Sequence, residues 1–127
     1  DNYMAACGLF AVDEDPANHA TQSVDFALLV LNILEDTNIK LNSELQIRIG
    51  INSDGPIIAG VLGTENRVFD IIGDTINVAS RLEHKAEPGH IMMSKKTYDL
   101  VCNCGYKIVP KGEVFLKGKG NMPAYSI

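Results

Sequence analysis

The sequence lacks the features that mark several large classes of protein. No apolar run in its 127 residues approaches the ~20 residues that a membrane-spanning helix needs. Its start shows no charged segment followed by an apolar one, so no secretory signal is expected. Positive charge is in deficit, with 11 Lys and Arg against 16 Asp and Glu and a net charge of −5. This balance argues against a broad nucleic-acid or anionic-membrane surface, although a local basic pocket for a small phosphorylated molecule remains compatible with it.

Cysteine is also scarce. Three cysteines, an odd number, indicate reduced thiols in an intracellular protein rather than a disulfide framework. Cys102 and Cys104 have one residue between them and lack the second pair that a structural zinc site would need. We therefore expect a soluble intracellular segment, and any membrane anchor of a longer parent protein would lie outside these residues.

The chain has the size and hydrophobic content of a single domain. Its 46% hydrophobic residues suffice for a core but leave no room for a second domain, and the sequence contains no internal repeats. Periodicity and turn residues predict helices over 17–36, 75–82 and from 95 to about 101, and strands over 3–10, 45–52, 57–62, 68–72, 106–109 and 114–117. Such a mixture indicates an α+β or α/β fold.

The most informative stretch runs from Asp70 to Arg81, where a strand is expected to turn sharply into a helix. Gly73 can adopt unusual backbone angles, and Asp74 suits the capping of the first free N–H groups of the helix. Asn77 and Arg81 are four residues apart, so an amide and a permanent cation share one helix face. Asp70 lies at the C-terminal end of the strand, where α/β proteins tend to place ligand-binding groups.

Each of these residues also has a purely structural interpretation. Asn77 could be a solvated helix residue, and Arg81 could lie along the surface over an acidic neighbour such as Glu83. The combination of acid, amide and guanidinium at these spacings, and not any one residue, indicates nucleotide chemistry.

Six blocks of the chain resemble, in order, the catalytic domain of class III nucleotidyl cyclases. They are DNYMAACGL at the start, IRIGIN at 47–52, GPIIAGVLG at 55–63, the run from Asp70 to Leu82, PGHIMMSKKTY at 88–98 and LKGKG at 116–120. The resemblance implies an α+β, ferredoxin-like cyclase fold in which residues 1–127 form a single partial catalytic domain, without its first strand and first helices. One departure is the stretch 51–56, which has one residue more than the common pattern before the glycine and predicts a bulge or longer turn.

The resemblance implies roles for individual residues. Cyclases let the ribose 3′-hydroxyl attack the α-phosphorus while pyrophosphate leaves, which requires metal ions, cations and donors around the transition state. Asn77 is similar to the asparagine that orients the ribose, and Arg81 to the arginine that stabilises charge on the α-phosphate. Lys117 is similar to the lysine that reaches the terminal phosphates, although by itself it would be taken for a solvated hairpin lysine. Arg48 resembles a strand arginine that binds phosphate in some members, and a solvated arginine explains it equally well.

The resemblance assigns metal binding and the selection of the nucleotide base to two aspartates. Asp1 is similar to one of the family's two metal-binding aspartates, and its hard oxygen ligands suit Mg²⁺ or Mn²⁺. The other metal aspartate and the lysine that completes adenine selection would lie upstream. Asp70 is similar to the aspartate that accepts from the adenine amino group in adenylyl cyclases. Because a carboxylate would face the O6 acceptor of guanine unfavourably, ATP is favoured over GTP.

The family's sites form between two catalytic domains arranged head to tail. The resemblance therefore implies a homodimer in which Asp1 of one chain faces the nucleotide-binding residues of its mate. We expect an adenylate cyclase that converts ATP to 3′,5′-cyclic AMP and pyrophosphate for intracellular signalling. The alternatives are a guanylate cyclase and a catalytically inactive cyclase-like module that dimerises or senses nucleotides. Because a first-strand carboxylate is absent, residues 1–127 alone should show little cyclisation.

Overall fold

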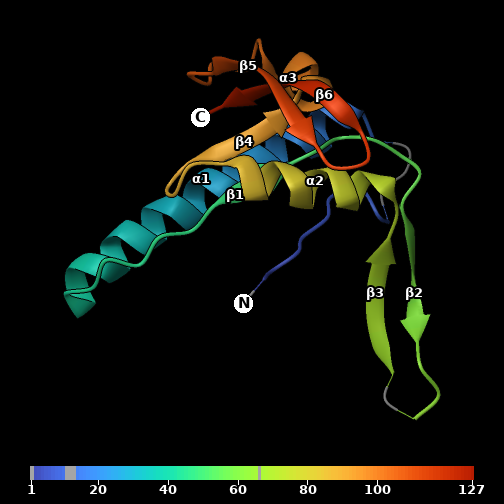
Figure 1. The fold of residues 1–127 in the computed structure, drawn as a ribbon. Helices are drawn as coiled ribbons and strands as arrows, with labels where there is room; N and C mark the ends of the chain where they lie inside the picture. Colours follow the sequence, from blue (N-terminus) through green and yellow to red (C-terminus); the bar gives the residue numbers. More distant parts are fainter. Residues whose placement is uncertain (1, 11–13, 66) are drawn as a thin grey trace.

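The computed structural model describes residues 2–10, 14–65 and 67–127 (Figure 1). Its elements are α1 (Pro16–Leu41), β1 (Ile49–Ile51), β2 (Ile58–Leu62), β3 (Val68–Ile72), α2 (Asp74–Lys85), β4 (Ile91–Ser94), α3 (Lys95–Val101), β5 (Val109–Leu116) and β6 (Gly120–Ser126). The predicted helices and the α+β class are confirmed. Within the described ranges, no helix is both long and apolar enough to cross a bilayer.

The main sheet has four strands in the order β1-β4-β6-β5. β1 and β4 are parallel, whereas β6 runs antiparallel to both of its neighbours. All four residues of β4 are buried, and alternate residues serve different cores: Ile91 and Met93 belong to one cluster and Met92 to the other. Because successive strand side chains point to opposite faces, the sheet is covered on both sides.

The two cores identify the covering helices. The cluster around Ile91 and Met93 includes Val24 of α1 and Val101 of α3, whereas the cluster around Met92 includes Leu82 of α2. In Figure 1, α1 accordingly lies behind the sheet and α2 in front of it. α2 is therefore held by its apolar face on the sheet, with its opposite face available for polar side chains.

β2 and β3 form a separate two-stranded arm that projects away from the rest of the protein (Figure 1). Its register pairs Ile58 with Ile72 and Gly60 with Asp70. Six large apolar side chains of the arm are 48–68% exposed; they are Ile58, Val61, Leu62, Val68, Phe69 and Ile72. The arm thus carries an apolar surface outside both cores.

The strand predicted over 3–10 is wrong. Residues 2–6 have no regular structure, residues 7–10 form bends, and Tyr3 and Phe10 are 80% and 90% exposed. A strand needs a neighbour for its backbone hydrogen bonds, and none of the strand pairings in the described part of the chain involves this segment. Residues 3–10 thus have the hydrophobic pattern of a strand, but no described strand pairs with them.

The strand predicted over 45–52 is reduced to three residues. Only Ile49–Ile51 pair with β4. The backbone of Leu45 is bound instead by the side chain of Asn38: the Leu45 N–H donates to Oδ1 at 2.9 Å, and Nδ2 donates to the Leu45 carbonyl at 2.8 Å. A side-chain amide therefore replaces a neighbouring strand at this point.

The last hairpin also differs from the prediction. A single strand, β5, includes 114–116 of the strand predicted over 114–117 but only Val109 of the strand predicted over 106–109, and its partner β6 was not predicted. A register shift between Pro110 and Gly112 lets β5 continue through residues 110–113, which lay between the two predicted strands. The Lys-Gly-Lys-Gly stretch then forms the tight connection from β5 to β6.

Candidate functional site

α2 begins directly after the arm, where the chain turns at Gly73. The Gly73 carbonyl accepts the first helical hydrogen bond, from the N–H of Asn77 at 3.3 Å. A β-carbon at Gly73 would lie 3.2 Å from the carbonyl oxygen of Pro56, so the approach of the 52–57 connection favours a residue without a side chain. The predicted cap at Asp74 is wrong, because Gly73 occupies the cap position and no side-chain capping bond forms there.

Asp74, Asn77 and Arg81 form one polar stripe along α2, because their spacings of three and four residues repeat the helical turn. Val78 and Leu82 face the sheet and are 4% and 1% exposed. Asn77 is exposed and Arg81 is half-buried. The shared face predicted for Asn77 and Arg81 is thus present, and it extends to the start of the helix.

The connection between β5 and β6 lies beside this stripe. Gly118 has a φ of 76°, and a β-carbon there would lie 3.8 Å from both terminal nitrogens of Arg81. The guanidinium therefore lies against the turn at 117–119. The turn is closed by the N–H of Lys119, which donates to the Leu116 carbonyl at 2.9 Å.

The cations around the turn differ in their surroundings. The ammonium of Lys119 forms an ion pair with the carboxylate of Asp74. Lys117 is exposed and directly follows β5, which ends one residue before the predicted strand end at 117. Neither Lys117 nor Arg81 forms an ion pair with any residue that the structure describes. Arg81 thus lies against the turn in which Lys117 follows β5, and Asn77 shares its helix face; cations and an amide of this kind suit an anion such as a polyphosphate.

Arg48 lies on a different side of α2. Its Nε is 3.0 Å from Oε1 of Glu83, so Glu83 pairs with Arg48 and the alternative that it pairs with Arg81 is wrong. Positions 81 and 83 point about 200° apart around an α-helix, which separates Arg48 from the stripe. Close packing at Gly50 sets this contact, because a β-carbon there would lie only 2.1 Å from the Ala79 carbonyl oxygen of α2.

Asp70 lies on the arm, opposite Gly60. Its side chain is exposed, and its Oδ1 accepts the N–H of Ile71 at 2.8 Å. It makes no hydrogen bond to Asn77 or Arg81. Asp70 therefore lies four residues before the start of the stripe in the sequence, and no hydrogen bond between described residues joins it to the stripe.

The predicted metal ligand, Asp1, lies outside the described residues, so its role stays a prediction. Within the described ranges, no three or more His, Cys, Asp and Glu side chains gather into a potential metal site. Two carboxylates that interact with Lys119, Asp54 and Asp74, each form an ion pair with a lysine. The described donors by themselves thus do not fit a divalent-metal centre.

Sequence reasoning missed a second charged group beside the turn. The Lys96 ammonium lies 2.5 Å from Asp54 Oδ2, and the Gly55 N–H donates to Oδ1 at 2.9 Å. The hydrogen bond from Lys96, then that from Gly55 and the charges of Lys96 and Lys119, hold the pKa of Asp54 below its ordinary value. The one signal in the sequence was the extra residue within 51–56, the stretch that contains Asp54.

Comparisons with known proteins all indicate one family. The sequence model of the adenylate and guanylate cyclase catalytic domain family matches residues 1–127. Soluble guanylate cyclase 89Da of Drosophila melanogaster is 42% identical over 123 residues, which are 97% of this chain and 17% of that protein. Adenylate cyclase type 9 of Gallus gallus is 37% identical over 128 residues, which are 97% of this chain and 10% of that protein.

A solved structure extends the likeness to three dimensions. The guanylate cyclase domain of RhGC from Catenaria anguillulae, in complex with GTP, superimposes with a TM-score of 0.82 at 36% identity, over 94% of this chain and 63% of that one. The chain thus spans less than a fifth of the two curated relatives and about two-thirds of the solved domain. The relatives include both guanylate and adenylate cyclases, so they do not fix the base. Because the family model covers the whole chain and the fold agrees, this chain belongs to the adenylate and guanylate cyclase catalytic domain family.

Proposed function

We propose that this chain contributes the nucleotide-binding residues of a cyclase that forms a 3′,5′-cyclic nucleotide and pyrophosphate from a nucleoside triphosphate inside the cell. The observation that carries the proposal is the position of Arg81 against Gly118 of the 117–119 turn, which is next in sequence to Lys117, and on the same helix face as Asn77. In the reaction, a bond forms between O3′ and the α-phosphorus while the bond to the leaving pyrophosphate breaks. Negative charge grows on the α-phosphate and on the leaving group.

Arg81, Lys117 and Asn77 suit this distribution of negative charge. Arg81, which is half-buried, is assigned to the α-phosphate, where a fixed donor is most effective because little reorganisation is needed. Lys117, at the exposed end of β5, is assigned to the β- and γ-phosphates. Asn77 is assigned to the ribose, one helical turn from Arg81, and orients the 3′-hydroxyl.

The test is the production of cyclic nucleotide by the longest natural chain that carries these residues, with Mn²⁺ and ATP. Arg81→Ala should lower kcat about 100- to 1,000-fold, as loss of a transition-state donor does. Lys107→Ala removes an exposed lysine that forms no ion pair with a described residue, and it should leave the rate unchanged. If both variants kept wild-type activity, the assignment of Arg81 would be wrong. ATP binding without turnover by the wild type would favour the nucleotide-sensing module.

We favour ATP as the substrate because of Asp70. A carboxylate accepts from the 6-amino group of adenine, whereas it would meet the O6 acceptor of guanine with no hydrogen between them. The measurement is the ratio of kcat/KM for ATP to that for GTP. Asp70→Cys should lower this ratio at least tenfold, and a wild-type preference for GTP would contradict the proposal and favour a guanylate cyclase.

We also propose a homodimer with sites shared between two copies. The support is the resemblance and the apolar surface of the β2–β3 arm, since monomers rarely leave such patches exposed. Mixing the two inactive variants Asp1→Ala and Arg81→Ala tests the arrangement. If each site takes Asp1 from one copy and Arg81 from the other, random mixed dimers contain one intact site, and about one quarter of wild-type activity should return. No recovery in a demonstrated mixed dimer would exclude shared sites.

A further inference from the structure

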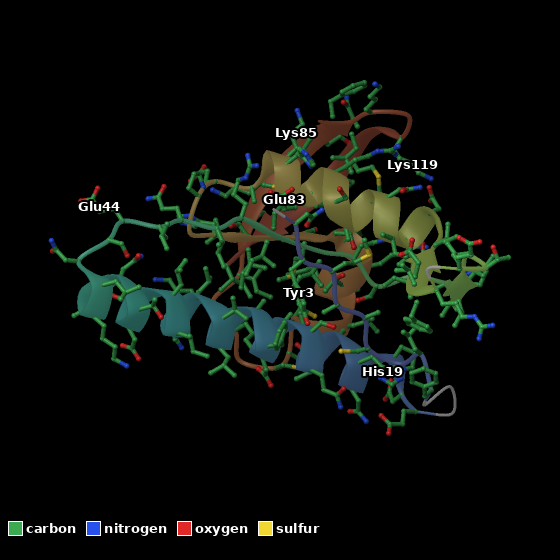
Figure 2. The ribbon with its side chains drawn as sticks, turned by 90° about the horizontal axis from the view of Figure 1, so that it is seen from below. Tyr3, His19, Glu44, Glu83, Lys85 and Lys119 are labelled. Carbon is green, nitrogen blue, oxygen red and sulfur yellow. The ribbon has the colours of Figure 1, made fainter. Side chains whose placement is uncertain are left out.

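Lys117 and Lys119 are alike in the sequence but not in the structure. They flank Gly118, and either could serve as a phosphate ligand. Lys119, however, is 32% exposed at its side chain and its ammonium is ion-paired with Asp74, the first residue of α2. Figure 2 shows Lys119 between the β5–β6 hairpin and α2. The charge of Lys119 is therefore paired within the chain, whereas Lys117 forms no ion pair with a described residue.

Asp74 is well placed to hold a cation. It lies in the first turn of α2, where the positive end of the helix dipole favours a carboxylate. It also belongs to the same stripe as Arg81, so a tie from Asp74 to the turn acts on the segment that lies against the guanidinium. The pair thus connects the start of α2 with the turn that presents Lys117.

A second ion pair supports the first. Asp54, in the connection between β1 and β2, is bound by Lys96 of α3, and its charge also interacts with that of Lys119. Lysine and carboxylate alternate in the order Lys96, Asp54, Lys119 and Asp74, and their formal charges cancel. The two ion pairs therefore add no net charge beside the proposed phosphate site.

We propose that Asp74 and Lys119 are positioning residues, whose ion pair holds the 117–119 turn against α2 so that Lys117 and Arg81 face one triphosphate. The proposal deepens the proposed function and rests on it for the identity of the ligand. Gly118, with a φ of 76°, gives the turn its tight shape but no side chain that could anchor it. Without the ion pair, the turn would keep the pairing of Leu116 with Gly120 and the bond from the Lys119 N–H to the Leu116 carbonyl, which close the hairpin but do not tie it to α2.

Substitution of Asp74 separates this role from direct phosphate binding by Lys119. If Lys119 were a ligand, Asp74→Asn would release its ammonium to the phosphates and activity would stay or rise. If the pair positions the turn, Asp74→Asn and Lys119→Gln should each lower kcat/KM roughly tenfold. This value lies between the few-fold effect of losing an exposed ion pair and the ~100-fold effect of misplacing a catalytic group. The double variant should be no worse than either single one.

The experiment is a double-mutant cycle in the longest natural chain that carries these residues. Lys119→Arg should retain activity, and the exchanged pair Asp74→Lys with Lys119→Asp should recover at least part of it, because the attraction is restored. The matched control is Asp99→Asn, which breaks the Lys95–Asp99 pair of 2.7 Å on the surface of α3 and should change kcat/KM less than twofold. Additive losses, or a silent Asp74→Asn, would overturn the inference.

A second readout does not depend on turnover. Hydrogen–deuterium exchange of the amides at 117–119 should become faster in Asp74→Asn and in Lys119→Gln, return toward the wild-type rate in the exchanged pair, and remain unchanged in Asp99→Asn. If the protein formed no cyclic nucleotide but exchange followed this pattern, the positioning role would stand and the proposed reaction would fail. Unchanged exchange in all four variants would overturn the positioning role, whatever the activity.

Discussion

Gly50→Ala tests whether the packing of α2 on β1 controls the site. A β-carbon at Gly50 would lie 2.1 Å from the Ala79 carbonyl oxygen and 2.3 Å from the Glu83 nitrogen, both of which are backbone atoms of α2. Ordinary C···O contacts begin near 3.3 Å, so α2 would have to move away from the sheet by about 1.2 Å. Overpacking of this kind costs about 1–3 kcal/mol of unfolding free energy.

The displacement should also reach the chemistry, because Asn77 and Arg81 travel with α2. At about 4 °C per kcal/mol, the melting temperature should fall by about 4–12 °C. A misplacement of about 1 Å should lower kcat/KM by up to ~100-fold.

Thermal unfolding and cyclic-nucleotide production are measured together. The matched control is Gly60→Ala in the exposed arm, because a β-carbon there would meet no atom within 4 Å. Equal stability and equal activity in the Gly50→Ala and Gly60→Ala variants would refute the packing argument.

Two further predictions follow from ion pairs outside the stripe. Arg48→Gln should leave kcat/KM within about threefold of the wild type, since an exposed pair with Glu83 is worth under ~1 kcal/mol; a loss as large as that of Arg81→Ala would instead assign Arg48 to the phosphates. Lys96 holds the pKa of Asp54 below its ordinary 3.8, so ionised Asp54 stabilises the folded state above about pH 4, and this contribution should be lost as the pH falls through the lowered pKa. In urea unfolding from pH 6 to pH 2, the difference between the wild type and Asp54→Asn should shrink toward the acid end, and a constant difference would contradict the cause assigned to the shift.

The helices were predictable because their signals are local. Asp15 accepts the N–H of Ala17 at 2.9 Å and Pro16 opens α1, as expected for residues that fit the first turn. The Ser94 hydroxyl accepts the N–H of Thr97 at 3.3 Å at the start of α3. The strands were less predictable, because a strand exists only where another strand is beside it. The segment over 3–10 has a suitable pattern but takes part in no strand pairing of the described residues. Over 45–48 the Ile47 carbonyl accepts the N–H of Gly89 at 2.7 Å, but the register of β1 with β4 begins only at Ile49.

The candidate site likewise has features that could be predicted from the sequence and features that could not. The common face of Asn77 and Arg81 follows from helical periodicity, and the position of Lys117 at a strand end follows from the glycine after it. The partner of each charge does not follow from the sequence: Glu83 binds Arg48, and Asp74 binds Lys119 across 45 positions of the chain. Nothing in the sequence ranked these pairings above the alternatives.

The sequence by itself determined the family, the type of most elements and the residues that suit a nucleotide, since motif spacing and helical periodicity act over a few residues. The tertiary structure alone decided which cations remain unpaired. Close packing at Gly50 fixes where α2 lies on the sheet, and the β5–β6 turn then meets its polar stripe. Lys119 is thereby bound to Asp74, while Lys117 and Arg81 remain without a partner among the described residues. That distinction depends on which segments meet in space, and no local pattern in the sequence encodes it.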